Sequence, residues 1–169
     1  MKLEPFQQCL KDGIIRTDTL ASLGLVPPPR RLKEKRSVAM IECVQQIPCN
    51  SCALACKLKA IHMENVNDIP QIDYDKCTGC MACAMTCPGL AIFLLRSEDA
   101  RGYVTLPYEF LPTPDAGQEV TALNREGKAL GKGKVMRILP PKRNDGTALV
   151  TIEVPEEWLL EARAIRVGE

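Results

Sequence analysis

The chain has 169 residues, a mass of 18.7 kDa and a net charge of +1 at pH 7. Its 46% of apolar residues suffices for compact cores, and its balanced charge argues against a nucleic-acid-binding protein. The longest apolar run, residues 90–95, is far shorter than the ~18 residues of a membrane span, and no secretory signal is legible, so we expect a cytoplasmic protein without a membrane span.

Residues 1–37 are expected to form an N-terminal extension. Apolar spacing and a breaking glycine predict two short helices, at residues 5–11 and within residues 14–25. Three consecutive prolines at residues 27–29 predict extended backbone. The basic run RRLKEKR at residues 30–36 is either a solvated linker or an arm whose cations meet an acidic partner surface.

Residues 38–97 contain short elements around most of the cysteines of the chain. Residues 38–42 predict a strand, and a second strand at residues 92–95 is expected to pair with it. A hairpin of residues 60–64 and 70–74 is expected between two short helices, which we place at residues 53–59 and 85–90.

The cysteines decide the chemistry of this region. The chain has nine, and eight of them lie between residues 43 and 87. Dense thiols in a reducing compartment indicate metal or redox chemistry rather than a disulfide framework. The ninth, Cys9, has no neighbouring cysteine, and we expect it to be an ordinary buried thiol.

The spacing of the eight cysteines is more informative than their number. Residues 77–88 read CTGCMACAMTCP, which is C-x2-C-x2-C-x3-C-P, and residues 43–56 read CVQQIPCNSCALAC, which differs in spacing only by a first gap of five residues. Three cysteines and an Ala-Ile pair recur at an interval of 31 residues: Cys49, Cys52, Cys56 and Ala60-Ile61 correspond to Cys80, Cys83, Cys87 and Ala91-Ile92. The repeat predicts two copies of one metal-binding unit.

Residues 38–97 resemble the two-[4Fe-4S] bacterial-type ferredoxin family, most closely over IDYDKCTGCMACAMTCPGLAI at residues 72–92. In that family the last cysteine of each run serves the other cluster. The resemblance therefore implies two [4Fe-4S] clusters with crossed ligands. The first set of ligands is Cys43, Cys49, Cys52 and Cys87, and the second set is Cys56, Cys77, Cys80 and Cys83.

Crossed ligation implies that metal binding and folding are coupled, with a poorly ordered apo segment. One residue departs from the family pattern: Lys57 follows Cys56 where the family has a proline, as at Pro88. This departure concerns the local geometry and potential of one cluster, not its existence. Zinc bound by paired C-x2-C motifs and a [3Fe-4S] site remain as alternatives.

Other residues near the cysteines are assigned no chemistry. The single histidine, His62, aligns with the apolar Phe93 in the repeat and is expected to be a strand or surface residue. Nearby methionines are expected to shield the clusters, and they are Met40, Met63, Met81 and Met85.

Residues 98–169 lack cysteine and predict a small antiparallel β-barrel-like domain. Strands are expected in GYVTLPYEF, EVTAL, KVMRIL, ALVTIEV and IRV. Turns are expected at residues 124–127 and 144–146, and GKALGKGK at residues 127–134 is interpreted as a hairpin tip because it fails the P-loop pattern. A short helix is expected at residues 156–164, with Trp158 packed inward.

The fold class implied is α+β: a ferredoxin-type β-α-β repeat around two [4Fe-4S] clusters, an extended N-terminal arm and the small C-terminal domain. Two neighbouring clusters relay single electrons, and no catalytic constellation is credible with one histidine. We therefore expect an electron-transfer subunit without a catalytic site of its own. A free-standing ferredoxin carrier and a structural or redox-sensing iron–sulfur module are the alternatives.

The flanking extensions favour the subunit over the free carrier, which needs only a core of about 60 residues and is usually acidic. The layout resembles the ferredoxin-like subunits of flavin-dependent amine or amino-acid dehydrogenases. That resemblance implies an FAD-containing flavoprotein partner in a hetero-oligomeric oxidoreductase complex.

Overall fold

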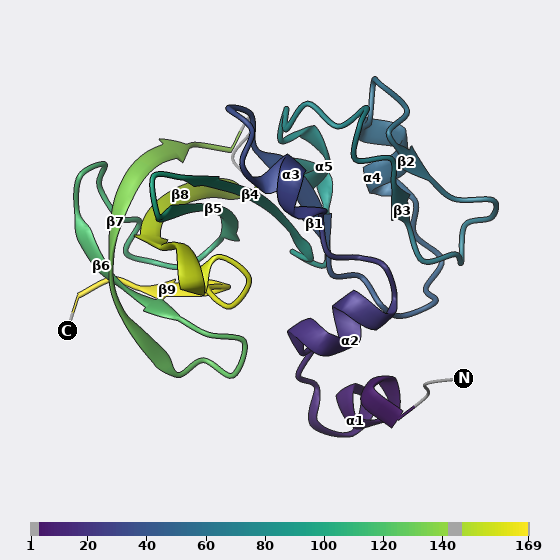
Figure 1. Ribbon diagram of the computed structural model, residues 1–169, viewed down its shortest axis with the longest axis horizontal. Helices are drawn as coiled ribbons and strands as arrows, with labels where there is room; N and C mark the ends of the chain where they lie inside the picture. Colours follow the sequence, from purple (N-terminus) through teal and green to yellow (C-terminus); the bar gives the residue numbers. More distant parts are fainter. Residues whose placement is uncertain (1–3, 142–146, 169) are drawn as a thin grey trace.

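The computed structural model describes residues 4–141 and 147–168 (Figure 1). Its helical elements are α1 (Glu4–Asp12), α2 (Thr17–Ser22), α3 (Pro29–Leu32), α4 (Ser51–Ala55), α5 (Ala82–Thr86) and the 3-10 turn η1 (Glu156–Trp158). Its strands are β1 (Val38–Ile41), β2 (Ile61–His62), β3 (Gln71–Ile72), β4 (Ile92–Glu98), β5 (Arg101–Tyr108), β6 (Glu119–Leu123), β7 (Ala129–Leu139), β8 (Ala148–Pro155) and β9 (Ala164–Arg166). None of the helices in this described part is long and apolar enough to cross a membrane.

One antiparallel sheet of seven strands organises the molecule, in the order β1-β4-β5-β8-β7-β6-β9. The expected pairing of the first strand is confirmed, because Val38 lies opposite Leu95 and Ile41 opposite Ile92. The expected hairpin is also present, with Ile61 opposite Ile72, although its strands have only two residues each. Figure 1 shows this hairpin beside α4, at the opposite end of the molecule from β6, β7 and β9.

Strands β1 and β4 carry a separate core on each face, because successive side chains of a strand point to opposite sides. On the face with α4 and α5, Ala39, Ile41, Ile92 and Leu94 are buried together with Cys52 and Cys83. On the other face, Met40, Phe93 and Leu95 join Leu20 and Leu25 of the N-terminal extension and the strands of the C-terminal part. Cys52 and Cys83 therefore lie on one side of the sheet, and Leu20 and Leu25 of the extension lie on the other, together with Cys9.

The strands expected after residue 98 are present, but they do not form a separate sheet. Strand β5 pairs with β4 from Leu94↔Thr105 to Glu98↔Arg101, so the sheet runs across the expected boundary between residues 97 and 98. Figure 1 shows β5 to β9 as a strongly curved sheet, and the strand order leaves β1 and β9 as its edges. Closure of these strands into a barrel is not shown.

Several local expectations are wrong in detail. Most of the segment 127–134 lies in β7, and the turn before it spans Asn124 to Lys128, whose backbone groups bond to each other. The expected helix at 156–164 is only the turn η1, although Trp158 does pack against the core. The expected turn at residues 144–146 lies outside the described residues.

The extension also differs from expectation. Pro29 is not extended but begins α3, because its fixed φ suits the first turn of a helix. As a result Arg31 of the basic run turns inward and is only 4% exposed.

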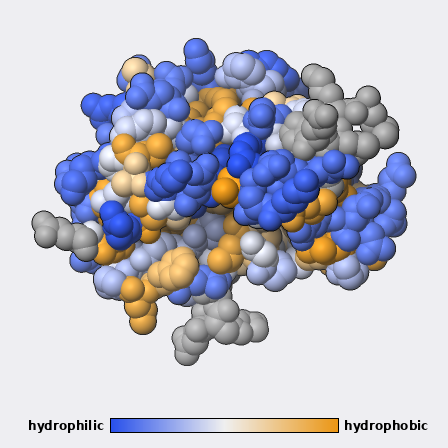
Figure 2. Space-filling view, turned by 90° about the horizontal axis from the view of Figure 1, so that it is seen from below, coloured by the Kyte–Doolittle hydropathy of each residue, from blue (hydrophilic) through white to orange (hydrophobic). Residues whose placement is uncertain are grey.

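Figure 2 shows a mostly hydrophilic face with hydrophobic side chains in small separate groups.

Candidate metal centre

The run that begins at Cys77 is shaped by its own turn residues. The side chain of Asp73 accepts the backbone N–H groups of Asp75 and Lys76 at 3.1 and 3.3 Å, which closes a turn just before the first cysteine. Gly79 has a φ of +66°, and a Cβ there would lie 2.1 Å from the carbonyl oxygen of Ser37. Only glycine therefore lets this loop approach the chain that leads into β1.

The two halves of the repeat are built alike. Helices α4 and α5 carry Cys52 and Cys83, and each ends at an extended cysteine, Cys56 or Cys87. The helices end earlier than expected because of this extended backbone. The Sγ atom of Cys56 accepts the N–H of Ala60 at 3.2 Å, and that of Cys87 accepts the N–H of Ala91 at 3.4 Å.

The structure brings the eight cysteines together in two groups of four. One cavity, between α5, the β2–β3 hairpin and the face of β1 and β4, is lined by the second set, Cys56, Cys77, Cys80 and Cys83. A separate cavity is lined by the first set, Cys43, Cys49, Cys52 and Cys87. Each group takes three cysteines from one run and one from the other.

The two cavities differ in size. The cavity of the second set has a volume of about 280 Å³ and is otherwise lined mainly by apolar side chains. The cavity of the first set has a volume of only about 30 Å³. A polynuclear cluster in the first set therefore requires its loop to open.

The loop of the first set is the one with the five-residue gap. The N–H of Cys49 donates to the carbonyl oxygens of Ile47, at 2.8 Å, and of Val66, at 3.0 Å, so the loop of the β2–β3 hairpin holds it from outside. The residues between the first two cysteines are mostly exposed, at positions 45–48. Such an exposed loop can adjust with little loss of buried contact.

The donor set fits an iron–sulfur cluster better than a single ion. Zinc requires four donors within about 2.3 Å of one ion. Within residues 4–141 and 147–168, no three Cys, His, Asp or Glu side chains are placed to hold one ion. The thiols of the second set instead surround a volume, which is what a cluster with four iron corners needs.

Burial controls the protonation of the thiols. It raises the pKa of Cys83 to about 12 and that of Cys52 to about 11, and it also raises the pKa of Cys43. The buried thiols are thus neutral at pH 7. Ligation requires thiolates, so metal binding must release protons.

A buried arginine of α3, Arg31, fixes the backbone just before and at the first cysteine of the second run. Arg31 donates from Nε to the carbonyl oxygen of Tyr74 and from Nη2 to that of Cys77, both at 2.7 Å, and it also pairs with Glu34. The N–H of Ala39 reaches the Sγ atom of Cys77 at 3.5 Å. The sequence of the basic run predicts only a linker or an arm, because nothing in it marks which cation faces inward.

The remaining expectations near the cysteines have mixed outcomes. Cys9 is buried, as expected. His62 is exposed on β2 and lines neither cysteine cavity. Met81 and Met85 do pack against the cysteine-side core, whereas Met40 lies on the opposite face of the sheet, because it alternates with Ala39 and Ile41.

Comparison with known proteins supports the iron–sulfur assignment of the second run. A family model described as the 4Fe-4S binding domain (Fer4) matches residues 70–93. No curated protein and no solved structure matches the chain. Residues 70–93 therefore form a 4Fe-4S binding domain, which supports an iron–sulfur protein of ferredoxin type.

Proposed function

We propose that the first and second sets each hold a [4Fe-4S] cluster with crossed ligands, and that the chain relays single electrons between two partners. The observation that carries this proposal is the lining of the two cavities, each by four cysteines drawn from both runs. A [4Fe-4S] cluster supplies one-electron storage when bound, and the protein supplies ligation, burial and docking.

The residues of the chain have distinct tasks in this proposal. The apolar side chains of Ala39, Ile61 and Leu94 keep water from the second set. The N–H groups of Ala60 and Ala91 stabilise charge on the sulfur atoms that they reach. Electrons enter at one set and leave at the other, so a donor loses and an acceptor gains one electron in each cycle.

We further propose that the chain is a subunit of a hetero-oligomeric oxidoreductase with an FAD-containing flavoprotein, of the amino-acid dehydrogenase type that its layout resembles. In this proposal the chain consists of an arm at residues 1–37, the dicluster unit at residues 38–97 and a β-rich unit at residues 98–169. The loop after β5 exposes two adjacent apolar side chains, Phe110 and Leu111, a feature of docking surfaces. A free-standing ferredoxin carrier is the second candidate, favoured only by the family match to the cluster-binding segment.

Cys56→Ala tests the crossed assignment. Cys56 lies in the first run but lines the cavity of the second set. The variant is therefore expected to lose the cluster bound by residues 77–83 and to keep the other. Iron and sulfide content and the EPR spectrum of reduced, anaerobically prepared protein measure this.

Cys49→Ala is the matched control, because it removes a ligand of the first set alone. If Cys56→Ala and Cys49→Ala damage the same cluster, the crossed assignment is wrong. Colourless wild-type protein containing zinc would contradict the proposal as a whole. Co-purification of the native protein with a flavoprotein supports the subunit proposal. A free monomer of 18.7 kDa in gel filtration supports the carrier instead.

A further inference from the structure

We infer that the two cluster sites are electrostatically unequal and that the second set has the higher reduction potential, so that electrons collect there before they leave. This inference rests on the proposed function. It follows from the charges and the exposure around the two cavities, which are among the protein's means of setting the potential of an iron–sulfur cluster.

The repeat places different residues at the same position of each site. Lys57 and Pro88 each follow the last cysteine of their run, and they are 31 residues apart. Lys57 lines the cavity of the second set, whereas Pro88 lines that of the first. A cation therefore faces one site where an uncharged ring faces the other.

The residue before the first cysteine of each run also places a positive charge at the second set and none at the first. Lys76 precedes Cys77 and lines the cavity of the second set. Glu42 precedes Cys43, but its carboxylate accepts hydrogen bonds from Arg125 and Arg163 and does not line the first cavity. Among the residues described, the lining of the first cavity includes no Lys, Arg, Asp or Glu.

Nearby acids cancel only part of this difference, because Lys57 stays unpaired among the described residues. Asp73 pairs with Lys76 at 2.8 Å, and Glu34 pairs with Arg31, which leaves Lys57 without an acidic partner among the described residues. Around Glu42, the charges of Arg125 and Arg163 are balanced by Glu42 and by Glu161, which lies 3.9 Å from Arg125. The net positive charge thus belongs to the second set.

Exposure acts in the same direction, whereas hydrogen bonds reach both sets. The N–H groups of Ala39 and Ala60 reach Cys77 and Cys56 of the second set, the N–H of Ala91 reaches Cys87 of the first, and Ser51 Oγ lies 3.7 Å from Cys49 Sγ. Cys80 of the second set is exposed, whereas every cysteine of the first set is buried or half-buried. Cations and water both stabilise the state with one more negative charge.

The inequality gives the relay a direction. A one-electron donor is oxidised at the first set, the electron passes to the second set, and a one-electron acceptor is reduced there. The acceptor meets the side of the molecule where Cys80, Lys57 and Leu58 are exposed. The energy gap between the sites keeps the electron from returning.

Lys57→Gln tests the inference. In anaerobic holoprotein, a redox titration followed by EPR gives the two potentials, and hyperfine-shifted cysteine β-proton signals show which set is reduced first. We expect the second set first in the wild type. Removing the charge should lower the potential of that set by an amount equivalent to about a tenfold change in its reduction equilibrium, or about 59 mV for one electron.

Two variants serve as controls. Lys57→Arg keeps the charge and should keep the potential. Lys132→Gln removes the same charge on β7, where Lys132 is 67% exposed and pairs with Glu119, and should move neither potential. Equal shifts in Lys57→Gln and Lys132→Gln would overturn the inference.

The order of reduction separates this inference from the proposed function. Protein that carries two reversible clusters but reduces the first set first overturns the inference and leaves the electron-relay proposal intact. Protein that binds no cluster overturns both.

Discussion

Arg31 is the residue whose role the sequence least reveals. It is one of five cations in RRLKEKR, yet it alone is buried, and its guanidinium joins α3 to the backbone at Tyr74 and Cys77. Hydrogen bonds from a charged donor are stronger than neutral ones, and leaving their acceptors unpaired is costly. The arginine therefore fixes the start of the second cysteine run.

Arg31→Gln should lower the free energy of unfolding by about 2–3 kcal/mol, because two carbonyl oxygens lose a charged donor. Thermal unfolding of the anaerobic holoprotein, followed by circular dichroism and by visible absorbance, measures the loss. The absorbance of the cluster is expected to disappear at a lower temperature than in the wild type.

The neighbouring arginine provides the control. Arg30 pairs with Asp75, but the two side chains are 64% and 67% exposed, and such surface pairs contribute little. Arg30→Gln should therefore change stability by less than about 0.5 kcal/mol. Similar losses of stability in the two variants would show that the buried hydrogen bonds of Arg31 do not stabilise the protein more than a surface ion pair does.

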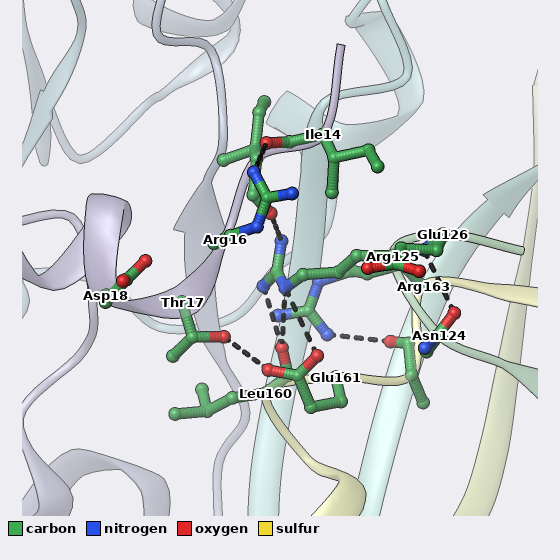
Figure 3. Close-up of polar contacts among 12 residues, drawn as sticks. Ile14, Arg16, Thr17, Asp18, Asn124, Arg125, Glu126, Leu160, Glu161 and Arg163 are labelled. Carbon is green, nitrogen blue, oxygen red and sulfur yellow. Dashed lines mark hydrogen bonds and ion pairs between the residues drawn. The ribbon is translucent and has the colours of Figure 1, made fainter. Parts of the chain in front are cut away.

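Several elements far apart in the sequence meet at one buried carboxylate. Glu42, at the end of β1, accepts from Nη1 of Arg125 at 2.7 Å and from Nε of Arg163 at 2.7 Å. Arg125 also donates to the carbonyl oxygens of Ile15 and Leu160. In Figure 3 the guanidinium groups of Arg125 and Arg163 lie next to each other, and Thr17 reaches Glu161 from the N-terminal extension.

This Glu42 cluster connects the extension, β1, the turn before β7 and the segment before β9. The side chains of Glu42, Arg125 and Arg163 are only 6–7% exposed, so each charge depends on its partners. Burial lowers the pKa of Arg163, and the charge of Glu42 opposes that change. The arrangement fixes the residue that precedes Cys43, and it does so from the face opposite the cysteines.

Glu42→Gln should destabilise the protein by about 3–5 kcal/mol, because it leaves two buried guanidinium groups without a compensating charge. Denaturant unfolding of the holoprotein measures the change. Glu119→Gln is the matched control, since Glu119 pairs with Lys132 on the surface, where the side chains are 65% and 67% exposed. An equally small effect of both variants would refute the importance of the cluster.

At the scale of the whole molecule, two kinds of stabilisation meet at β1 and β4. The long strands β5 and β8 pair over eight residues through backbone hydrogen bonds and an apolar core to which none of the eight clustered cysteines belongs. The cysteine side has only two-residue strands and five-residue helices, and its core includes Cys52 and Cys83. We therefore expect that side to depend on metal for its order.

Removal of iron by a chelator should loosen the cysteine side and leave the large sheet folded. Hydrogen exchange followed by mass spectrometry is expected to show faster exchange over residues 49–91 and unchanged protection in β5 and β8. Uniform loss of protection would mean that the clusters hold the entire chain together, and no loss would mean that the cysteine side folds without them.

The amino-acid sequence by itself determined the cysteine spacing, the repeat, the first paired strands and most strands after residue 98. These features depend on local chemistry: thiols must be spaced to surround a cluster, and alternating apolar residues make strands. The tertiary structure alone decided that β4 and β5 join the two halves into one sheet, that Arg31 and Glu42 are buried, and that Lys57 faces one cavity. Such contacts join residues tens of positions apart, and a charged side chain has the same local preferences whether it is later solvated or enclosed.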